Sequence, residues 1–272
     1  MFKKISFENG KREIYLGKFK IFQYYKNISR IQYMIKRELQ QSMMNFFPRN
    51  NYSDFERQTI SIDRFQFLLT RANIPHKYKP IFINLYIQSE KKEEELIFID
   101  GGAHAGVFCD VALACGGICY AYEPNIFLYT FLKNLYKNNN NIILSNKALS
   151  HEAGKMKFYN INNDLIGTGN SLIKTNFYHQ EDSGYEVETI NFCSHLKELI
   201  LKHGHIALVK LDIEGAEFEI LNKLIEEKLY KNIDYIMVET HERFFENPQE
   251  KLKPLQQAIL DNNINNIFLD WI

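Results

Sequence analysis

Four acidic residues of this chain each follow directly on a run of apolar residues: Asp100, Glu123, Asp212 and Glu239. Such a run, without polar alternation, is typical of a strand that is buried on both faces of a parallel sheet. The carboxyl ends of parallel strands lie on one edge of the sheet, so we expect the four carboxylates to face a common crevice. There they could accept hydrogen bonds from hydroxyl groups, attract a cation, or take a proton from a substrate.

A glycine-rich turn follows the first of these acids, where residues 100–106 read Asp-Gly-Gly-Ala-His-Ala-Gly. Glycine allows a tight turn and a close approach of a ligand, and the next helix would point its N-terminal amides at that ligand. A dinucleotide is one candidate, but an acid directly before the turn would repel a pyrophosphate. S-adenosylmethionine has an ammonium, a sulfonium and a ribose, and therefore fits better. Glu123 lies 23 positions after Asp100, where a carboxylate can accept both ribose hydroxyls.

Strands and helices alternate in the second part of the chain. The buried runs predicted as strands lie at residues 96–100, 118–122, 142–144, 206–212 and 234–239. Segments with helical periodicity lie at residues 107–115, 126–136, 192–203, 218–228 and 252–262. A short last strand is expected at 267–271. The alternation predicts an α/β fold with a Rossmann-like, mostly parallel sheet and helices on both faces.

Residues 1–90 have a different pattern and are expected to form an N-terminal, mainly helical extension of a domain that spans residues 91–272. Partial alternation around a glycine at 14–22 predicts a hairpin. Helical spacing of apolar residues predicts helices at 28–47 and 63–72 and a further segment at 81–88. This extension could cover the acceptor site, dock a partner or form a homo-oligomer contact.

The bulk composition excludes several classes of protein. The formal net charge of the 272 residues is zero, which gives no indication of nucleic-acid binding. The four cysteines form no metal-binding pair, so buried, reduced thiols in a cytoplasmic protein are expected. No stretch has the roughly 18–20 apolar residues that a membrane-spanning helix needs, and no signal-peptide core is present at the start of the sequence.

Five strings resemble the motif set of the FkbM-type S-adenosylmethionine-dependent methyltransferases. They lie at residues 100–106, 122–125 (Tyr-Glu-Pro-Asn), 146–149 (Asn-Lys-Ala-Leu), 209–217 (Val-Lys-Leu-Asp-Ile-Glu-Gly-Ala-Glu) and 238–241 (Val-Glu-Thr-His). The resemblance implies a seven-stranded class I methyltransferase fold, with an antiparallel last strand, and O-methylation, often of a sugar hydroxyl. One departure is Asn191, where the family often carries an aspartate.

The resemblance also implies roles for individual residues. The methionine part of the cofactor would lie against Asp100, Gly101, Gly102, Ala103 and Gly106. Glu123 would hold the ribose, and the adenine would be bordered by Asn146, Lys147 and Ala148. Asp212 would lie next to the methyl group. The residues expected to contact the acceptor are His104, Asn170, Ser171, Lys210 and Glu239.

Methyl transfer to an alcohol requires alignment of donor and acceptor and removal of the hydroxyl proton. His241 or Asp212, and then His104, could take that proton. A divalent metal held by Asp212 with Glu214 or Glu239 could instead lower the pKa of the hydroxyl. We favour the metal-free base, with Asp212, His241 and Glu214 as the catalytic set and no metal ligands assigned.

Two further residues of the string at 209–217 have interpretations that need no substrate. Lys210 lies inside an apolar strand, where an ion pair with a crevice acid is favoured over a substrate contact. Glu217 is expected to cap a helix or to face solvent.

The sequence thus predicts a cytoplasmic S-adenosylmethionine-dependent O-methyltransferase that acts on a carbohydrate or glycan precursor. One alternative is a nicotinamide-dependent oxidoreductase on a similar sheet, which the acid before the glycine turn argues against. The other is a non-catalytic binding or scaffold protein that retains the fold.

Overall fold

The computed structural model describes residues 2–6, 11–16, 19–25, 65–66, 68–70, 72–91, 95–159, 170–174 and 184–271. By their contacts, the residues divide into two compact units, Met1–Asn51 and Tyr52–Ile272. The division that the sequence suggests, 1–90 and 91–272, stays a prediction. The structure nevertheless places Phe82 and Leu85, from the end of that extension, in one hydrophobic core with Phe98.

The first unit contains a three-stranded antiparallel sheet in the order β1-β2-β3. Its strands are β1 (Phe2–Ser6), β2 (Lys11–Leu16) and β3 (Phe19–Tyr25). β2 and β3 pair where the sequence predicts a hairpin, and β1 adds a strand that the alternation did not reveal. The predicted helix at 28–47 lies outside the described residues.

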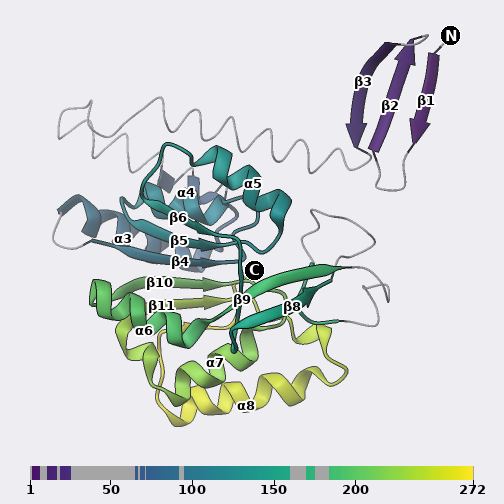
Figure 1. The fold of residues 1–272 in the computed structure, drawn as a ribbon. Helices are drawn as coiled ribbons and strands as arrows, with labels where there is room; N and C mark the ends of the chain where they lie inside the picture. Colours follow the sequence, from purple (N-terminus) through teal and green to yellow (C-terminus); the bar gives the residue numbers. More distant parts are fainter. Residues whose placement is uncertain are drawn as a thin grey trace. The chain divides into compact units, whose positions relative to one another are not determined.

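The second unit is built on a parallel sheet in the order β12-β11-β10-β4-β5-β6 (Figure 1). Its strands are β4 (Ile97–Gly101), β5 (Ile118–Tyr122), β6 (Ile142–Ser145), β10 (Ile206–Leu211), β11 (Ile233–Val238) and β12 (Ile267–Phe268). Every residue of the central strands β4 and β10 is buried. Their continuous apolar runs follow from this position, because helices cover both faces.

The prediction of seven strands with an antiparallel last strand needs correction. Among the described residues the central sheet has six strands, and the last one, β12, pairs with β11 in parallel. The chain between these two strands forms the helix α8 (Pro248–Asp261). Such a crossover returns the chain to the same end of the sheet, and the strand that follows it is therefore parallel.

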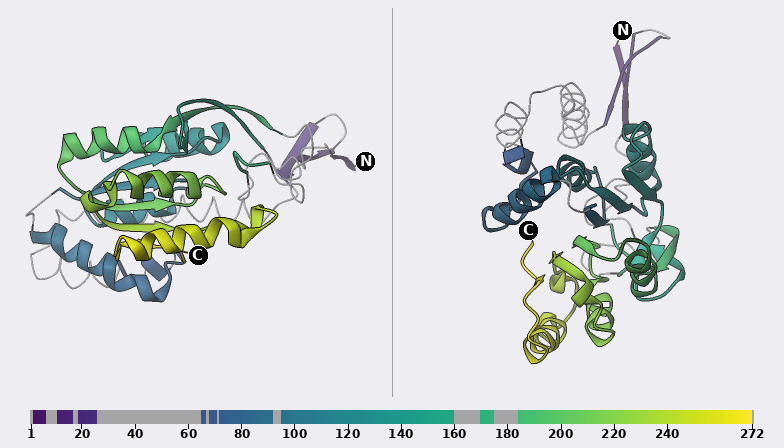
Figure 2. Two further views of the ribbon diagram at one scale, coloured as in Figure 1. Left: turned by 90° about the horizontal axis from the view of Figure 1, so that it is seen from below. Right: turned by 90° about the vertical axis from the view of Figure 1, so that its left-hand side faces the viewer.

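Two hydrophobic cores, one on each face of the sheet, hold the helices. Phe98 points into the core that contains Phe82, Phe108 and Leu132. Its neighbours Ile97 and Ile99 point into the opposite core, as the alternation of side chains along a strand requires. The helices of the first face are α3 (Lys79–Lys91), α4 (Val107–Ala114) and α5 (Ile126–Leu135). Those of the second are α6 (Phe192–His203), α7 (Glu217–Glu226) and α8; Figure 1 and Figure 2 show the two groups on opposite sides of the sheet.

A smaller sheet lies in the connection between β6 and α6. Its strands are β7 (Ala148–Ser150), β8 (Gly154–Phe158) and β9 (Tyr185–Asn191), in the order β7-β9-β8. Asn191 ends β9 and caps α6, because its side chain accepts a hydrogen bond from the Ser194 amide at 3.0 Å. An asparagine thus supplies here the capping oxygen that an aspartate would supply. Within the described part of the chain, no helix has the length and apolar character needed to cross a bilayer.

Candidate active site

The glycine turn after β4 is shaped by a close approach to the end of β10. Gly102 has φ +76°, and a Cβ at this position would lie 1.9 Å from the carbonyl oxygen of Asp212. The turn ends at Gly106, also with φ +76°, which is the N-cap residue of α4. Tyr136 supports that end, since its hydroxyl donates to the Gly106 carbonyl at 2.9 Å. Glycine is therefore required at Gly102 both by the backbone conformation and by the space available.

Asp100 and Lys210 form a buried ion pair across neighbouring strands. The two residues are partners in the register of β4 and β10, and Lys210 Nζ lies 3.3 Å from Asp100 Oδ1 and 3.3 Å from Asp212 Oδ2. The same ammonium donates to the carbonyls of Gly101 at 3.3 Å and Gly102 at 3.0 Å. Burial lowers the pKa of Lys210, but the two carboxylates outweigh it and hold the pKa above its usual range. The ion pair expected for Lys210 is thus present, and its expected contact with the acceptor stays a prediction.

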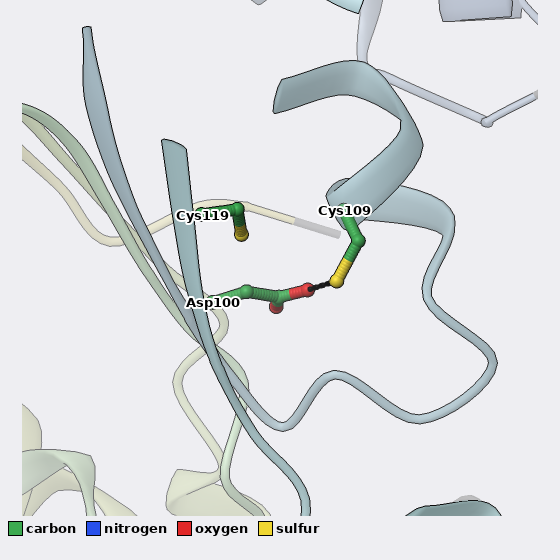
Figure 3. Close-up of side chains that lie close together, drawn as sticks. All are labelled: Asp100, Cys109 and Cys119. Atoms are coloured by element: carbon green, nitrogen blue, oxygen red, sulfur yellow. Dashed lines mark hydrogen bonds between the residues drawn. The ribbon is translucent and has the colours of Figure 1, made fainter. Parts of the chain in front are cut away.

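The other oxygen of Asp100 faces two cysteines. The thiol of Cys109 on α4 donates to Asp100 Oδ2 at 3.4 Å, and Cys119 on β5 lies close by (Figure 3). Asp100 is completely buried, and all four cysteines are buried free thiols. The first acid of the motif is therefore enclosed, whereas the side chains of Asp212 and Glu239 are partly exposed.

Glu123, at the end of β5, is fixed by the two strand-end loops. Its Oε2 accepts from the His104 amide at 2.7 Å, and its Oε1 accepts from the Asn125 amide at 2.8 Å. Burial raises its pKa to about 7 in spite of these two hydrogen bonds. Asn146 contacts the backbone of the same loop, because its Nδ2 donates to the carbonyls of Glu123 at 2.8 Å and Pro124 at 3.0 Å.

His241 lies close to the acidic side chains that follow β10 and β11. Its Nε2 lies 3.2 Å from Glu214 Oε2, 3.5 Å from Glu239 Oε1 and 3.9 Å from Asp212 Oδ1. The imidazole is completely buried, whereas the side chains of Glu239 and Asp212 are 26% and 30% exposed. Burial lowers the pKa of His241, but Glu217 and the nearby carboxylates outweigh it and raise the pKa to about 9. Burial also raises the pKa of Glu214, to about 8.

Glu217 holds this arrangement together, a role that the sequence did not reveal. It is completely buried at the start of α7. Its Oε1 accepts from the Ile213 amide and from His241 Nδ1, both at 2.9 Å, and its Oε2 accepts from the Gly215 amide at 2.8 Å. Glu217 therefore faces the loop and His241 and does not face solvent. An acid in the first turn of a helix is the one sequence signal that could have indicated it.

The remaining candidates lie at different distances from this centre. Ser171 donates from its hydroxyl to the Glu214 carbonyl and accepts from the Ile173 amide at 2.9 Å, which brings its segment to the cluster. Asn170 is buried beside it. Lys147 instead forms a surface ion pair with Glu188 at 2.9 Å, and Ala148 is buried in β7.

The structure thus brings two groups of predicted residues together at the carboxyl end of the sheet. Residues 100–265, which include both groups, match the model of the methyltransferase FkbM domain. The chain belongs to the FkbM methyltransferase family. Comparisons with curated proteins and with solved structures gave no match. The resemblance found in the sequence is confirmed, and the FkbM domain identifies the chain as a methyltransferase by family.

Proposed function

We propose that this FkbM protein transfers a methyl group from S-adenosylmethionine to a hydroxyl of a carbohydrate or glycan precursor. The main support is that Lys210 Nζ lies 3.3 Å from both Asp100 and Asp212. This ammonium links the base of the glycine turn, where the cofactor would bind, to the acid and histidine cluster, where a hydroxyl could lose its proton. The carbohydrate acceptor rests on the resemblance alone.

In the proposed complex the cofactor lies along the turn and the end of β5. Glu123 accepts hydrogen bonds from the ribose hydroxyls. Its carboxylate has lone pairs left for them after accepting hydrogen bonds from two backbone amides. Gly101, Gly102, Ala103 and Gly106 border the methionine part. Because Asp100 is completely buried, we assign it the task of holding Lys210 and the turn in place, without direct contact with the cofactor. Asn146 fixes the loop beside the adenine.

The chemical step is an in-line displacement at the methyl carbon. The acceptor oxygen forms the new C–O bond while the S–C bond breaks, and the sulfur keeps that electron pair. The hydroxyl proton passes to Asp212 or Glu239, whose carboxylates are partly exposed. His241, completely buried and with its pKa raised to about 9, supports these carboxylates as a positive partner and is a poorer proton acceptor at neutral pH. Glu214 completes the cluster.

Calorimetric titration of the full chain with S-adenosylmethionine and with NAD tests the cofactor. We expect saturable binding of S-adenosylmethionine only, with a large loss of affinity in Glu123→Ala. Glu219→Gln is a suitable control, because Glu219 forms a partly exposed ion pair with Lys251 of α8. Binding of NAD alone would instead favour the oxidoreductase.

Transfer of a labelled methyl group to a panel of glycans and nucleotide sugars tests the reaction. We expect incorporation into a carbohydrate that Asp212→Asn reduces at least tenfold with cofactor affinity retained. Cofactor binding without transfer to any hydroxyl acceptor would favour the scaffold alternative and contradict the proposal.

A further inference from the structure

We propose that Asp212, Glu214 and His241 form a binding site for one divalent cation of the Mn²⁺ type, with Glu239 at its edge. This inference deepens the proposed function and rests on it for its chemical purpose, but the cation site itself can be tested alone. It also reverses the preference for a metal-free base that the sequence suggested.

The first argument is the geometry of the donor atoms. One donor atom from each of Asp212, Glu214 and His241 lies within 4.8 Å of the other two. His241 Nε2 lies 3.2 Å, 3.5 Å and 3.9 Å from the carboxylate oxygens of Glu214, Glu239 and Asp212. These separations can be compared with the distances between ligand atoms around one ion. Ligands about 2.1 Å from one ion are roughly 3.0 Å apart when adjacent and 4.2 Å apart when opposite in an octahedron. The observed separations lie in this range.

The second argument is the orientation of His241. Its Nδ1 is fixed at 2.9 Å from Glu217 Oε1, and Glu217 is itself held by two backbone amides. A carboxylate on one ring nitrogen of a metal-binding histidine is the usual outer partner, because it fixes the ring and aims the other nitrogen at the ion. Nε2 of His241 is completely buried and makes no hydrogen bond within the described residues, as is also true of Glu214 Oε2.

The third argument is the balance of charge. Four carboxylates surround His241: those of Asp212, Glu214, Glu217 and Glu239. Lys210, which approaches Asp212, is shared with Asp100, and Arg243 lies 3.8 Å from Glu239 with an exposed side chain. A metal-binding imidazole is neutral, so a divalent cation on Nε2 would replace the proton of His241 and reduce the mutual repulsion of Asp212, Glu214 and Glu239. The partly exposed carboxylates of Asp212 and Glu239 provide a way in from the crevice.

The donor set indicates the kind of ion. Carboxylates suit Mg²⁺, Ca²⁺ and Mn²⁺, whereas imidazole is a ligand of transition metals. Two or three carboxylates with one imidazole therefore favour Mn²⁺ among these three ions. The group formed by Asp100, Cys109 and Cys119 is a poorer candidate, because it is completely buried and its carboxylate is paired with Lys210. A cation beside the acceptor oxygen would lower the pKa of a coordinated hydroxyl, and so favour loss of its proton.

Titration of the chelator-treated full chain with Mn²⁺, followed by the paramagnetic resonance signal of the free ion, tests the site. We expect one saturable site per chain and at least tenfold weaker binding in Glu214→Gln. Glu219→Gln serves as the matched control and should bind as the unchanged chain does. Glu214→Gln is expected to fold, because that carboxylate side chain accepts no backbone hydrogen bond among the described residues; thermal unfolding checks this. Asp212→Asn is a second variant with the same expected loss.

Absence of a saturable Mn²⁺ site, or equal binding in Glu214→Gln, would overturn the proposal. Binding of Mg²⁺ or Ca²⁺ as tight as that of Mn²⁺ would overturn the assignment of the ion type, because it would show that the imidazole adds nothing to the affinity. Titration with S-adenosylmethionine and methyl transfer in the presence of chelator separate this inference from the proposed function. Undiminished transfer without Mn²⁺ binding rejects the cation site and keeps the methyltransferase. Mn²⁺ binding without S-adenosylmethionine binding keeps the cation site and rejects the proposed methyltransferase activity.

Discussion

The ammonium of Lys210 lies 3.3 Å from a carboxylate oxygen of Asp100, although the two residues are 110 positions apart. The pair is possible because β10 and β4 are neighbours and the two residues are in register. Both side chains are buried, and Lys210 also reaches two carbonyls of the glycine turn. One cation thus secures the shape of the turn and connects it to the acids on the next strand.

Removal of this ammonium should destabilise the fold. Lys210→Met leaves Asp100 buried without its positive partner, and breaking a buried pair from one side typically costs about 3–5 kcal/mol. Urea unfolding measures the change. Lys155→Met, which breaks an exposed ion pair with Glu186, should have little effect. The double variant Asp100→Asn with Lys210→Met should recover part of the loss, and a double variant that is less stable than Lys210→Met would contradict this account.

A methyl group on Gly102 should be far more harmful than one on another glycine with a similar φ. Gly102→Ala would place its Cβ 1.9 Å from the Asp212 carbonyl, and we expect a loss of more than about 3 kcal/mol. Gly204, with φ +81°, has no atom within 4 Å of such a Cβ. Gly204→Ala should therefore cost only the backbone strain of about 1–3 kcal/mol. Equal losses in thermal unfolding would show that the close approach to Asp212 is not a constraint.

Glu217→Gln should loosen the loop between β10 and α7. The amide keeps one acceptor oxygen, so one of the backbone donors that Glu217 satisfies is left without a partner, at a cost of about 2 kcal/mol. Hydrogen exchange at the amides of Ile213 and Gly215 should become faster in the variant. Glu219→Gln, two positions away and in a partly exposed ion pair with Lys251, should leave these rates unchanged. Protection that persists in Glu217→Gln would argue against its role in holding the loop.

Glu123 should make stability depend on pH. Burial raises its folded-state pKa to about 7 from 4.5, so between these values the folded chain binds the proton more tightly than the unfolded chain. The contribution of this group to the free energy of unfolding is therefore greatest below pH about 4.5 and falls by roughly 3 kcal/mol as pH rises through 7. Glu123→Gln should flatten this part of the profile in urea unfolding at pH 5 to 8. An identical slope in the variant would contradict the assignment.

Much of the fold follows from local pattern. The apolar runs that became β4, β5, β10 and β11 are buried on both faces of a parallel sheet, and such runs are short, continuous and bounded by polar or glycine residues. The direction of the last strand was harder to predict, because within the described residues its ladder with β11 joins only Ile267 and Phe268. A strand of two residues has too little hydrophobic pattern to indicate whether it is parallel or antiparallel. Its parallel pairing depends on the helix α8 that precedes it.

Some residues of the candidate site could also be predicted from local pattern, and others could not. Asp212, Glu239 and His241 could be grouped from the sequence because the two acids each follow directly on a buried strand and His241 lies two positions after Glu239. Glu217 could not, because its burial depends on how α7 begins beneath the loop. Lys147 was assigned to the adenine by motif, but it lies directly before β7, where it pairs at the surface with Glu188 of β9.

The sequence by itself determined which residues end the buried strands and that a glycine turn follows the first of them, because periodicity and turn chemistry are local properties. Only the tertiary structure decided that Asp100 is enclosed by Lys210 and Cys109, and that His241 points its Nε2 at three acids from two strand ends. Those relationships depend on strand order, register and burial, which join residues far apart in the chain. The physical reason is that a carboxylate's surroundings, not its position in a motif, fix whether it holds a turn, accepts a proton or binds a cation.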